Sequence, residues 1–414
     1  MSRLLFLSRW FPYPPTNGSK LRVYNLLRIL AARHEVTLIS FAEPEERVAL
    51  DGLETICRDV HVIRRKPFVP GRLSARLAAL NPRPRFVVET WSDEYASQIR
   101  RELEQTHYDA VIASQFDTAA YASCFAGHPA LFEEVELGLM HGQYTGAKDA
   151  AHRLRYGLMW TKHSRYLNSL LEHFAAATVA SVQERALLRN TAPGFDAIEI
   201  VPNCVDLPEY AGLMVEPELG SLIFTGAFTY HANYEAASWF VNEVYPHVKV
   251  QYPAARLTIT GDHAGLPFPP APDVTLTGFV ADVRPIIACA WAAIVPMRQG
   301  GGTRLKILEA MALGVPVIAT SKGAEGLDAE PGRHLLVADE PAEFAETVVQ
   351  LLRSRARRQS LVEEALHLVA RRYDWQVVAP QFLALIDRVM SPRGPSSPLD
   401  RVGSERRTLT ESRS

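Results

Sequence analysis

The chain has 414 residues, of which 47% are hydrophobic, and a formal net charge of -2 at pH 7. This length exceeds one typical hydrophobic core, so we expect two domains of roughly 200 residues each. The near-neutral charge gives no support for nucleic acid as a partner. Four cysteines stand without CxxC or metal-ligand spacing, which is typical of reduced thiols in a cytoplasmic protein.

The N-terminus shows no signal-peptide pattern, because the apolar residues 4–8 lead directly into a polar loop. The longest apolar run extends from Ile286 to Met297 and is too short to cross a bilayer. We therefore expect a soluble or peripheral protein.

The first part of the chain has the pattern of a strand, a loop, a helix and a second strand. Residues 4–8 form a short apolar strand, and prolines with Asn17-Gly18 predict a loop after it. Ser19 is placed to cap an amphipathic helix over residues 21–32, and residues 35–41 form the next strand. This alternation is typical of a parallel sheet covered by helices.

A basic run without acidic residues extends from His61 to Arg85, and three leucines between 73 and 80 are spaced for a short amphipathic helix inside it. Two interpretations stay open. The run is either a solvated surface or a surface that lies on an anionic membrane, where each nearby cation contributes about 1 kcal/mol. Binding to vesicles with and without anionic lipid separates the two.

Polar residues follow two further predicted strands. Residues 110–114 are a strand that precedes Gln115, and a second strand-like run ends in the acidic residues Glu133, Glu134 and Glu136. Strand carboxyl ends face the ligand crevice in doubly wound sheets, so these side chains are candidate site residues. The alternative for the acidic residues is a solvated loop. Helices over 141–174 and 184–189 and strands over 179–181 and 198–202 follow.

Prolines and acidic residues over 207–218 predict a linker. A second alternating series begins beyond it, which again indicates a parallel sheet covered on both faces. Asn233 is placed to cap its first helix, and the composition beyond Ser391 predicts a disordered tail. The predicted strands cover 221–226, 256–261, 274–278 and 292–296, and the predicted final helices cover 342–352, 358–371 and 375–390.

Three glycines, 300–302, lead into Thr303, a good N-cap, and then into a short helix that Gly314 ends. Unpaired first-turn N–H groups and the helix dipole favour a phosphate at such a helix end, where Arg304 and Lys306 add positive charge. Glu309 is placed to accept hydrogen bonds from vicinal sugar hydroxyls. The alternative is a plain turn, with Lys306 and Glu309 as a surface ion pair worth a few tenths of a kcal/mol.

The phrase from Gly301 to Gly314 resembles the branch of glycosyltransferase family 4 that reads GGGTRLKILEAMA, and residues 323–327 are similar to the loop after it. The proline-rich loop with Gly18 and the run 202–206 also resemble that family. The resemblance implies an α/β protein of the GT-B fold, with two Rossmann-like doubly wound domains facing across a cleft. It implies an acceptor-side domain over 1–206 completed by the C-terminal helix 376–390, a linker over 207–218, a nucleotide-sugar-binding domain over 219–372 and a disordered tail over 391–414.

The resemblance also implies the residues of a donor site. Arg304 and Lys306 would stabilise the departing diphosphate as catalytic residues, and Glu309 would hold the ribose. The candidate nucleotide-binding residues are Gly301, Gly302, Thr303, Glu309, Val280 and Gly226. The candidates on the acceptor or donor-sugar side are Gly18, Arg22, Gln115 and Glu136. Glu134 is an alternative to Glu136 for orienting an acceptor hydroxyl.

Four positions depart from the family pattern. Gly301 stands where the family has a first glutamate, Gln115 is the nearest match to a family histidine, and Ala227 and His231 stand where an arginine and a lysine would contact the diphosphate. Among the nearby residues, Arg304 and Lys306 are the cations able to replace that pair.

We therefore expect a glycosyltransferase that moves a sugar from a UDP-sugar or GDP-sugar to an acceptor hydroxyl, with retention, in polysaccharide or glycoconjugate synthesis. No metal and no other cofactor is expected. The acceptor is a glycan, a lipid-linked molecule or a small molecule, and the protein is cytoplasmic, either free or peripheral at the inner membrane face. Two alternatives stay open, namely a protein that binds a sugar nucleotide without turnover and a sugar-nucleotide epimerase.

Overall fold

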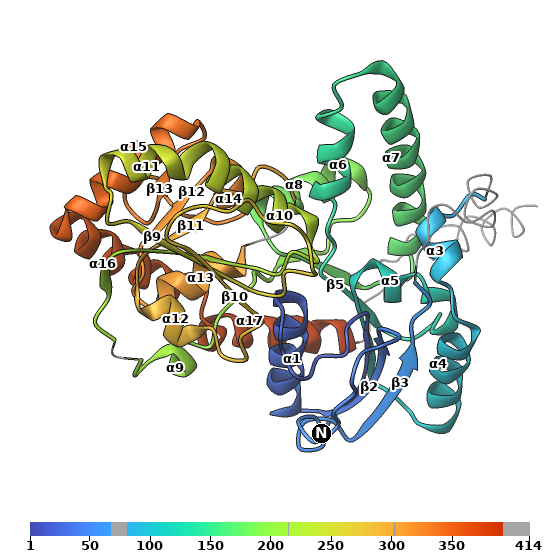
Figure 1. Ribbon diagram of the computed structural model, residues 1–414. Coiled ribbons are helices and arrows are strands. Elements are labelled where there is room, and N and C mark those ends of the chain that lie inside the picture. Colours follow the sequence, from blue (N-terminus) through green and yellow to red (C-terminus); the bar gives the residue numbers. More distant parts are fainter. Residues whose placement is uncertain (68–80, 214, 301–303, 392–414) are drawn as a thin grey trace, which may run out of the picture.

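The computed structural model describes residues 1–67, 81–213, 215–300 and 304–391. Two parallel sheets, one of seven strands and one of six, organise the described chain (Figure 1). We call the part built on the first sheet the first domain and the part built on the second sheet the second domain.

The first sheet has the strand order β3-β2-β1-β4-β5-β6-β7, and every pair in it is parallel. Leu4 and Phe6 pack in the core on one face, whereas Leu5 and Leu7 pack on the other, as the alternation of side chains along a strand requires. The strands are β1 (Arg3–Ser8), β2 (Glu35–Ala42), β3 (Asp59–Arg64), β4 (Ala110–Ser114), β5 (Ala130–Glu133), β6 (Ala176–Val179) and β7 (Ile198–Ile200).

Helices cover both faces of this sheet. The helix after β1 begins at Gly18, and its N-cap is Asn17, whose Oδ1 accepts a hydrogen bond of 3.0 Å from the Lys20 amide. The prediction that Ser19 caps it is therefore wrong, because the N-cap residue is Asn17 and its side chain accepts the hydrogen bond from a first-turn amide. The helices are α1 (Gly18–Ala31), α3 (Arg85–Thr90), α4 (Asp93–Gln105), α5 (Gln115–Ala119), α6 (Gly138–Thr145), α7 (Ala150–Leu171) and α8 (Val182–Thr191).

The second sheet has the order β10-β9-β8-β11-β12-β13, also with parallel pairs throughout. Its central strand β11 is buried along its whole length, so an apolar run is sufficient to form it. The strands are β8 (Glu218–Thr225), β9 (Arg256–Thr260), β10 (Val274–Gly278), β11 (Ala290–Val295), β12 (Val317–Ala319) and β13 (Leu336–Val337).

The helices of the second domain lie on both faces of its sheet (Figure 1). The helix after β8 begins at His231 with Tyr230 as its N-cap residue, so the prediction that Asn233 caps it is wrong. Asn233 lies inside the first turn and donates a hydrogen bond to the Ala227 carbonyl instead. The helices are α9 (Leu207–Tyr210), α10 (His231–Trp239), α11 (Tyr245–Gln251), α12 (Arg284–Ala288), α13 (Leu305–Ala312), α14 (Ser321–Ala324), α15 (Pro341–Arg353) and α16 (Arg355–Arg372), and a π-helical segment (Phe240–Val244) joins α10 to α11.

The last described helix, α17 (Trp375–Met390), returns to the first domain and lies near α1 (Figure 1). Its residues Trp375, Phe382 and Ile386 belong to the same buried cluster as Leu4 and Phe6 of β1. The final helix therefore completes the core under the first sheet, although it follows the second domain in sequence.

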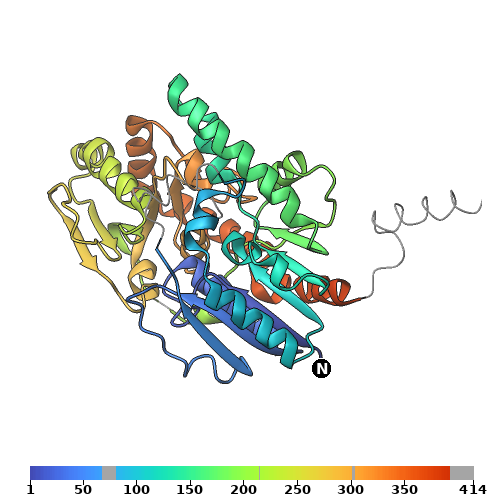
Figure 2. The ribbon, with the colours of Figure 1, turned by 90° about the vertical axis from the view of Figure 1, so that its right-hand side faces the viewer.

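Helices α6 and α7 form a hairpin that projects away from the first sheet, and Figures 1 and 2 show that the α7 end beside α6 stands clear of the body of the protein. Over the described residues, we find no helix with the length and hydropathy needed to span a bilayer. The helix predicted inside the basic run and nearly all of the predicted tail lie outside the described residues.

Candidate active site

A pocket of about 270 Å³ lies between the two domains. From the first domain it is lined by Glu134 and Glu136, which follow β5, and by α6. From the second domain the short helix α14, which follows β12, contributes Lys322, and its C-cap residue Glu325 also lines the pocket. Because β5 and β12 both end here, the pocket has the position of a ligand crevice at the carboxyl ends of parallel strands.

Lys306, in the first turn of α13, lies where three elements of the second domain meet. Its Nζ donates a hydrogen bond of 2.9 Å to Asn233 Oδ1 and lies 4.6 Å from the centroid of the Phe224 ring. A Cβ on Gly226 would come within 2.9 Å of this Nζ and 2.6 Å of Asn233 Nδ2. Only glycine therefore leaves room for the lysine between β8, α10 and α13.

Two groups of α13 carry shifted pKa values. Burial, with a smaller contribution from Arg304, lowers the pKa of Lys306 to about 7. Burial raises the pKa of Glu309 to about 7, and its Oε1 accepts a hydrogen bond of 3.2 Å from the Tyr210 hydroxyl. The shifts indicate that neither charge is fully compensated by the protein, and perturbed groups of this kind gather at functional sites.

Arg304 is buried at the N-cap position of α13, so Thr303 is not the cap that the sequence predicted. A Cβ on the neighbouring Gly300 would meet the Tyr230 hydroxyl at 2.6 Å and Arg304 Nη2 at 3.1 Å. The absence of a side chain at Gly300 therefore leaves room for the Arg304 guanidinium at the entry of the helix. Three of the predicted nucleotide-binding residues, Gly301, Gly302 and Thr303, lie outside the described residues.

Gly18 brings the first domain against the same helix. A Cβ placed on it would lie 3.7 Å from Leu305 Cδ2, at the start of α13. The loop before α1 therefore reaches the helix end that carries Arg304 and Lys306. Val280 is half-buried in the turn after β10, farther along the same edge of the second sheet.

Arg22 lies in the interior of the first domain and not in the cleft. Its Nε donates to Glu133 Oε1 at 2.8 Å, and its other nitrogens donate to the carbonyl oxygens of Val201 and Pro202 and to Asn203. Although burial disfavours its charge, Glu133 and Glu134 hold the pKa of Arg22 above its ordinary value. We therefore place Arg22 as a buried support for the edge of the sheet, out of reach of a ligand.

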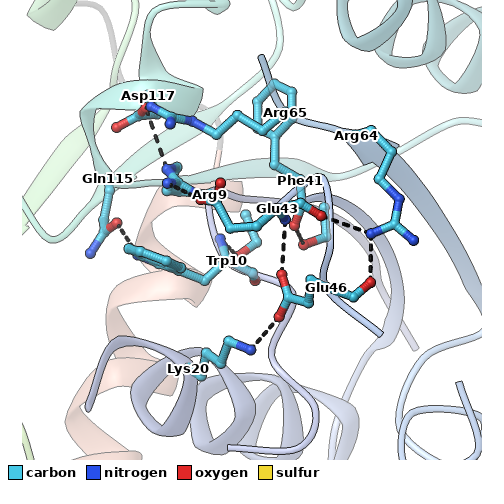
Figure 3. Close-up of polar contacts among 12 residues, drawn as sticks. Arg9, Trp10, Lys20, Phe41, Glu43, Glu46, Arg64, Arg65, Gln115 and Asp117 are labelled. Carbon is cyan, nitrogen blue, oxygen red and sulfur yellow. Dashed lines mark hydrogen bonds and ion pairs between the residues drawn. The ribbon is translucent and has the colours of Figure 1, made fainter. Parts of the chain in front are cut away.

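Gln115 and Glu134 form a pair that the sequence did not indicate. Both have left-handed backbones, with φ of 66° and 57°, directly after β4 and β5. Gln115 Nε2 donates to Glu134 Oε2 at 2.8 Å. Trp10 Nε1 donates to Gln115 Oε1 at 3.0 Å, as Figure 3 shows. Left-handed non-glycine residues cost of order 1–3 kcal/mol each and gather at functional sites. Burial raises the pKa of Glu134 to about 7.

Ion pairs join the residues that follow β1, β2 and β3 to each other and to α5, beside this pair (Figure 3). Arg9 Nη2 lies 2.6 Å from Glu43 Oε1, Arg9 Nε lies 3.6 Å from Asp117 Oδ1, and Arg65 Nη2 lies 2.7 Å from the same Asp117 oxygen. The Arg9 guanidinium also stacks 4.0 Å from the centroid of the Trp10 ring. These contacts hold Trp10 in place, and through it the amide of Gln115.

The site therefore combines two parts. The second domain offers a cationic helix end next to a half-buried carboxylate, and the first domain offers a rigidly held carboxylate in a pocket. Among the residues that the structure describes, His, Cys, Asp and Glu side chains form no group of three or more with a metal-binding arrangement.

A comparison with known protein families matches most of the second domain. Residues 220–354 match the family model of glycosyl transferases group 1, a segment that includes Gly226, Val280, Lys306 and Glu309. The chain is 21% identical over 394 residues to an uncharacterized 44.6 kDa protein in the cps region of Klebsiella pneumoniae, which covers 90% of this chain and 97% of that one.

Two solved structures are similar over most of the chain. Sucrose-phosphate synthase from Thermosynechococcus elongatus has a TM-score of 0.67 and 18% identity, covering 94% of this chain and 99% of that chain. Anabaena HepE in complex with UDP and glucose has a TM-score of 0.64 and 15% identity, covering 94% of this chain and 100% of that chain. At these sequence identities, both similarities show a shared fold.

Proposed function

For a chain that carries a glycosyltransferase group 1 domain within the two-domain GT-B fold, we propose transfer of a sugar from a nucleoside diphosphate sugar to an acceptor hydroxyl. One observation carries the proposal. Lys306 lies between Gly226 and Asn233 at the start of α13, one turn before Glu309. This spacing of a cation and a carboxylate along one helix supports the binding of a diphosphate next to a pentose.

The diphosphate would bind at the N-terminal end of α13. There the helix dipole, the first-turn amides, Arg304 and Lys306 all favour negative charge. The same groups would stabilise the charge that develops on the leaving diphosphate, and such preorganised donors lower a barrier by several kcal/mol. We propose no metal for this step, and Gly301, Gly302 and Thr303 remain proposed contacts.

The pentose would bind at Glu309. One of its oxygens already accepts from Tyr210, and a carboxylate has further lone pairs for vicinal hydroxyls. Backbone groups near Val280 would meet the base, so UDP-sugars and GDP-sugars both stay in the proposal. The complex of the structurally similar HepE with UDP and glucose makes a UDP-sugar the first donor to test.

The acceptor hydroxyl would bind in the pocket between the domains. Glu134 and Glu136 lie on its wall, and Gln115 donates a hydrogen bond to Glu134. Gly18, at the start of α1, remains a proposed contact of the acceptor. In the proposed step the bond between sugar C1 and the diphosphate oxygen breaks while a bond from the acceptor oxygen to C1 forms. The acceptor proton passes to Glu134, and retention of configuration is part of the proposal.

We expect Glu134→Gln to lower kcat/KM for the acceptor about tenfold or more and to change its pH dependence. The wild-type value should rise with pH through about 7, because only the ionised carboxylate accepts the proton, and the variant should lose that rise. The measurement is made at saturating donor. Glu309, which ionises in the same pH range, is then occupied by donor at every pH, so its ionisation does not change the amount of bound donor.

Glu136→Gln is the matched control for this prediction, since Glu136 lines the same pocket but is exposed and separate from the Gln115 pair. It should keep the rise. An unchanged pH profile in Glu134→Gln would remove that carboxylate from the proton transfer.

The proposed reaction is tested by adding UDP-sugars and GDP-sugars and measuring free nucleoside diphosphate with and without acceptors. Release that requires an acceptor supports transfer. Binding without release would favour a protein that binds a sugar nucleotide without turnover. Conversion of the sugar nucleotide to its epimer, without release of nucleoside diphosphate, would favour an epimerase. Release that persists with EDTA supports a metal-free step.

We further propose that the enzyme acts in the cytoplasm in polysaccharide or glycoconjugate synthesis, on a glycan, lipid-linked or small-molecule acceptor. The position of the Klebsiella relative in a cps region supports this choice of pathway class.

A further inference from the structure

Helix α7 has an unusual charge for a helix of its length. Its 22 residues, Ala150–Leu171, include Arg153, Arg155, Lys162 and Arg165 and not one aspartate or glutamate. Acidic residues occur only at its two caps, Asp149 and Glu172. In a chain of net charge -2, this helix is a local concentration of positive charge.

Large apolar side chains are exposed on the same helix. Leu154 is 67% and Leu158 is 64% exposed, although both are leucines of a long, regular helix. At 3.6 residues per turn, Leu154, Leu158, Lys162 and Arg165 fall on one face. We call these four residues the α7 stripe; its outer half is apolar and its inner half is cationic.

A groove of about 800 Å³ lies beside the inner half of the stripe. Arg83, at the end of the basic run, faces Lys162 and Arg165 across it, and Leu158 also lines it. Glu172 is the one carboxylate among the described lining residues. Burial, with a smaller effect of Arg85, lowers the pKa of Lys162. The described end of the basic run and α7 thus form one positive surface.

We infer that the α7 stripe and this groove dock the protein on an anionic lipid bilayer. Charge complementarity selects this occupant, because three cations line a groove whose edge carries exposed leucines. Anionic headgroups would neutralise the cations while the leucines enter the acyl boundary, as in amphipathic helices that lie on membranes. The α7 end beside α6 projects from the body of the protein, where it can meet a flat surface (Figures 1 and 2).

The hairpin also connects this surface with the pocket between the domains. Helix α6 packs against α7, with the His141 and Trp160 rings 5.1 Å apart, and His141 lines the pocket. A docked hairpin would therefore hold the pocket close to the bilayer. If the proposed function holds, the acceptor class that fits this placement is a lipid-linked acceptor; the docking itself does not depend on that function.

The test is flotation of the full chain with phosphatidylcholine vesicles that contain either no anionic lipid or about one third phosphatidylglycerol. We expect binding only to the anionic vesicles. Leu154→Ser with Leu158→Ser, and separately Lys162→Gln with Arg165→Gln, should each reduce the partition coefficient about tenfold or more. Val250→Ser and Arg355→Gln, exposed positions of the second domain, should leave it unchanged.

Circular dichroism shows whether each variant is folded, and release of nucleoside diphosphate with a soluble acceptor provides a second readout. Loss of vesicle binding with full activity on the soluble acceptor supports the inference. Equal binding of both vesicle types, or undiminished binding of both stripe variants, would overturn it. Stripe-dependent binding by a protein that releases no nucleoside diphosphate would leave the docking surface standing and sink the proposed function alone.

Discussion

Lys306→Ala should lower kcat by at least about tenfold, which corresponds to about 1.4 kcal/mol or more of lost transition-state stabilisation. The charge that develops on the leaving diphosphate needs a fixed cation, and removal of one preorganised donor commonly costs about a hundredfold. Lys306 is positioned for this by Asn233 and the Phe224 ring, and among the residues that the structure describes no carboxylate is hydrogen-bonded to it. The measurement is single-turnover release of nucleoside diphosphate at saturating donor.

Lys306→Met is the sharper variant, because it keeps an aliphatic side chain beside Phe224 and removes the charge together with its hydrogen bond to Asn233. It should behave like the alanine variant, whereas Lys66→Ala, at an exposed position of the first domain, should leave the rate unchanged. A methionine variant with the wild-type rate would show that the charge of Lys306 has no part in the reaction.

The pH dependence of donor binding follows from the same side chain. The pKa of Lys306 is about 7 in the free protein, so the lysine is charged below that pH and increasingly neutral above it. A bound diphosphate favours the charged form and raises this pKa. Binding above pH 7 must therefore include proton uptake, and we expect the Kd of UDP, measured by calorimetry, to rise as pH increases through 7. Lys306→Met should lack this dependence.

The apolar strands of both sheets could be predicted because buried parallel strands are continuous apolar runs, as in residues 110–114 of β4. The prediction of a strand, loop, helix and strand at the N-terminus is also confirmed. Strand β3 was missed because half of residues 59–64 are polar and the strand is mostly half-exposed at the edge of the sheet. The cap of α1 was misplaced by two residues, since Asn17 and Ser19 are equally good caps in sequence alone.

Some residues of the candidate site could likewise be predicted from the sequence, and others could not. Lys306 and Glu309 were predicted because their spacing lies within a single short helix. The pairing of Gln115 with Glu134 could not be predicted, because it needs the register of β4 against β5 and two left-handed backbones. One signal was available, namely that polar residues directly follow two apolar strands. The buried contact between Arg22 and Glu133 joins residues that are 111 positions apart in the sequence, so no local sequence pattern could predict it.

That buried pair predicts the largest effect on stability. Arg22→Ala should destabilise the first domain by about 3–5 kcal/mol, because Glu133 would remain buried without its counter-charge. The carbonyl oxygens of Val201 and Pro202 would lose their donors as well. Native-state hydrogen exchange of the β5 amides measures this cost in the first sheet itself.

Arg28→Ala is the matched control on the same helix. Arg28 forms exposed ion pairs with Asp206 and Glu209, so its loss should cost no more than about 1 kcal/mol. The double variant Arg22→Met with Glu133→Leu should recover much of the lost stability, because apolar side chains of similar volume replace a buried pair at little cost. Equal losses in Arg22→Ala and Arg28→Ala would mean that the interior position of Arg22 does not determine its contribution. Arg22 would then be free to serve the cleft, as the sequence first indicated.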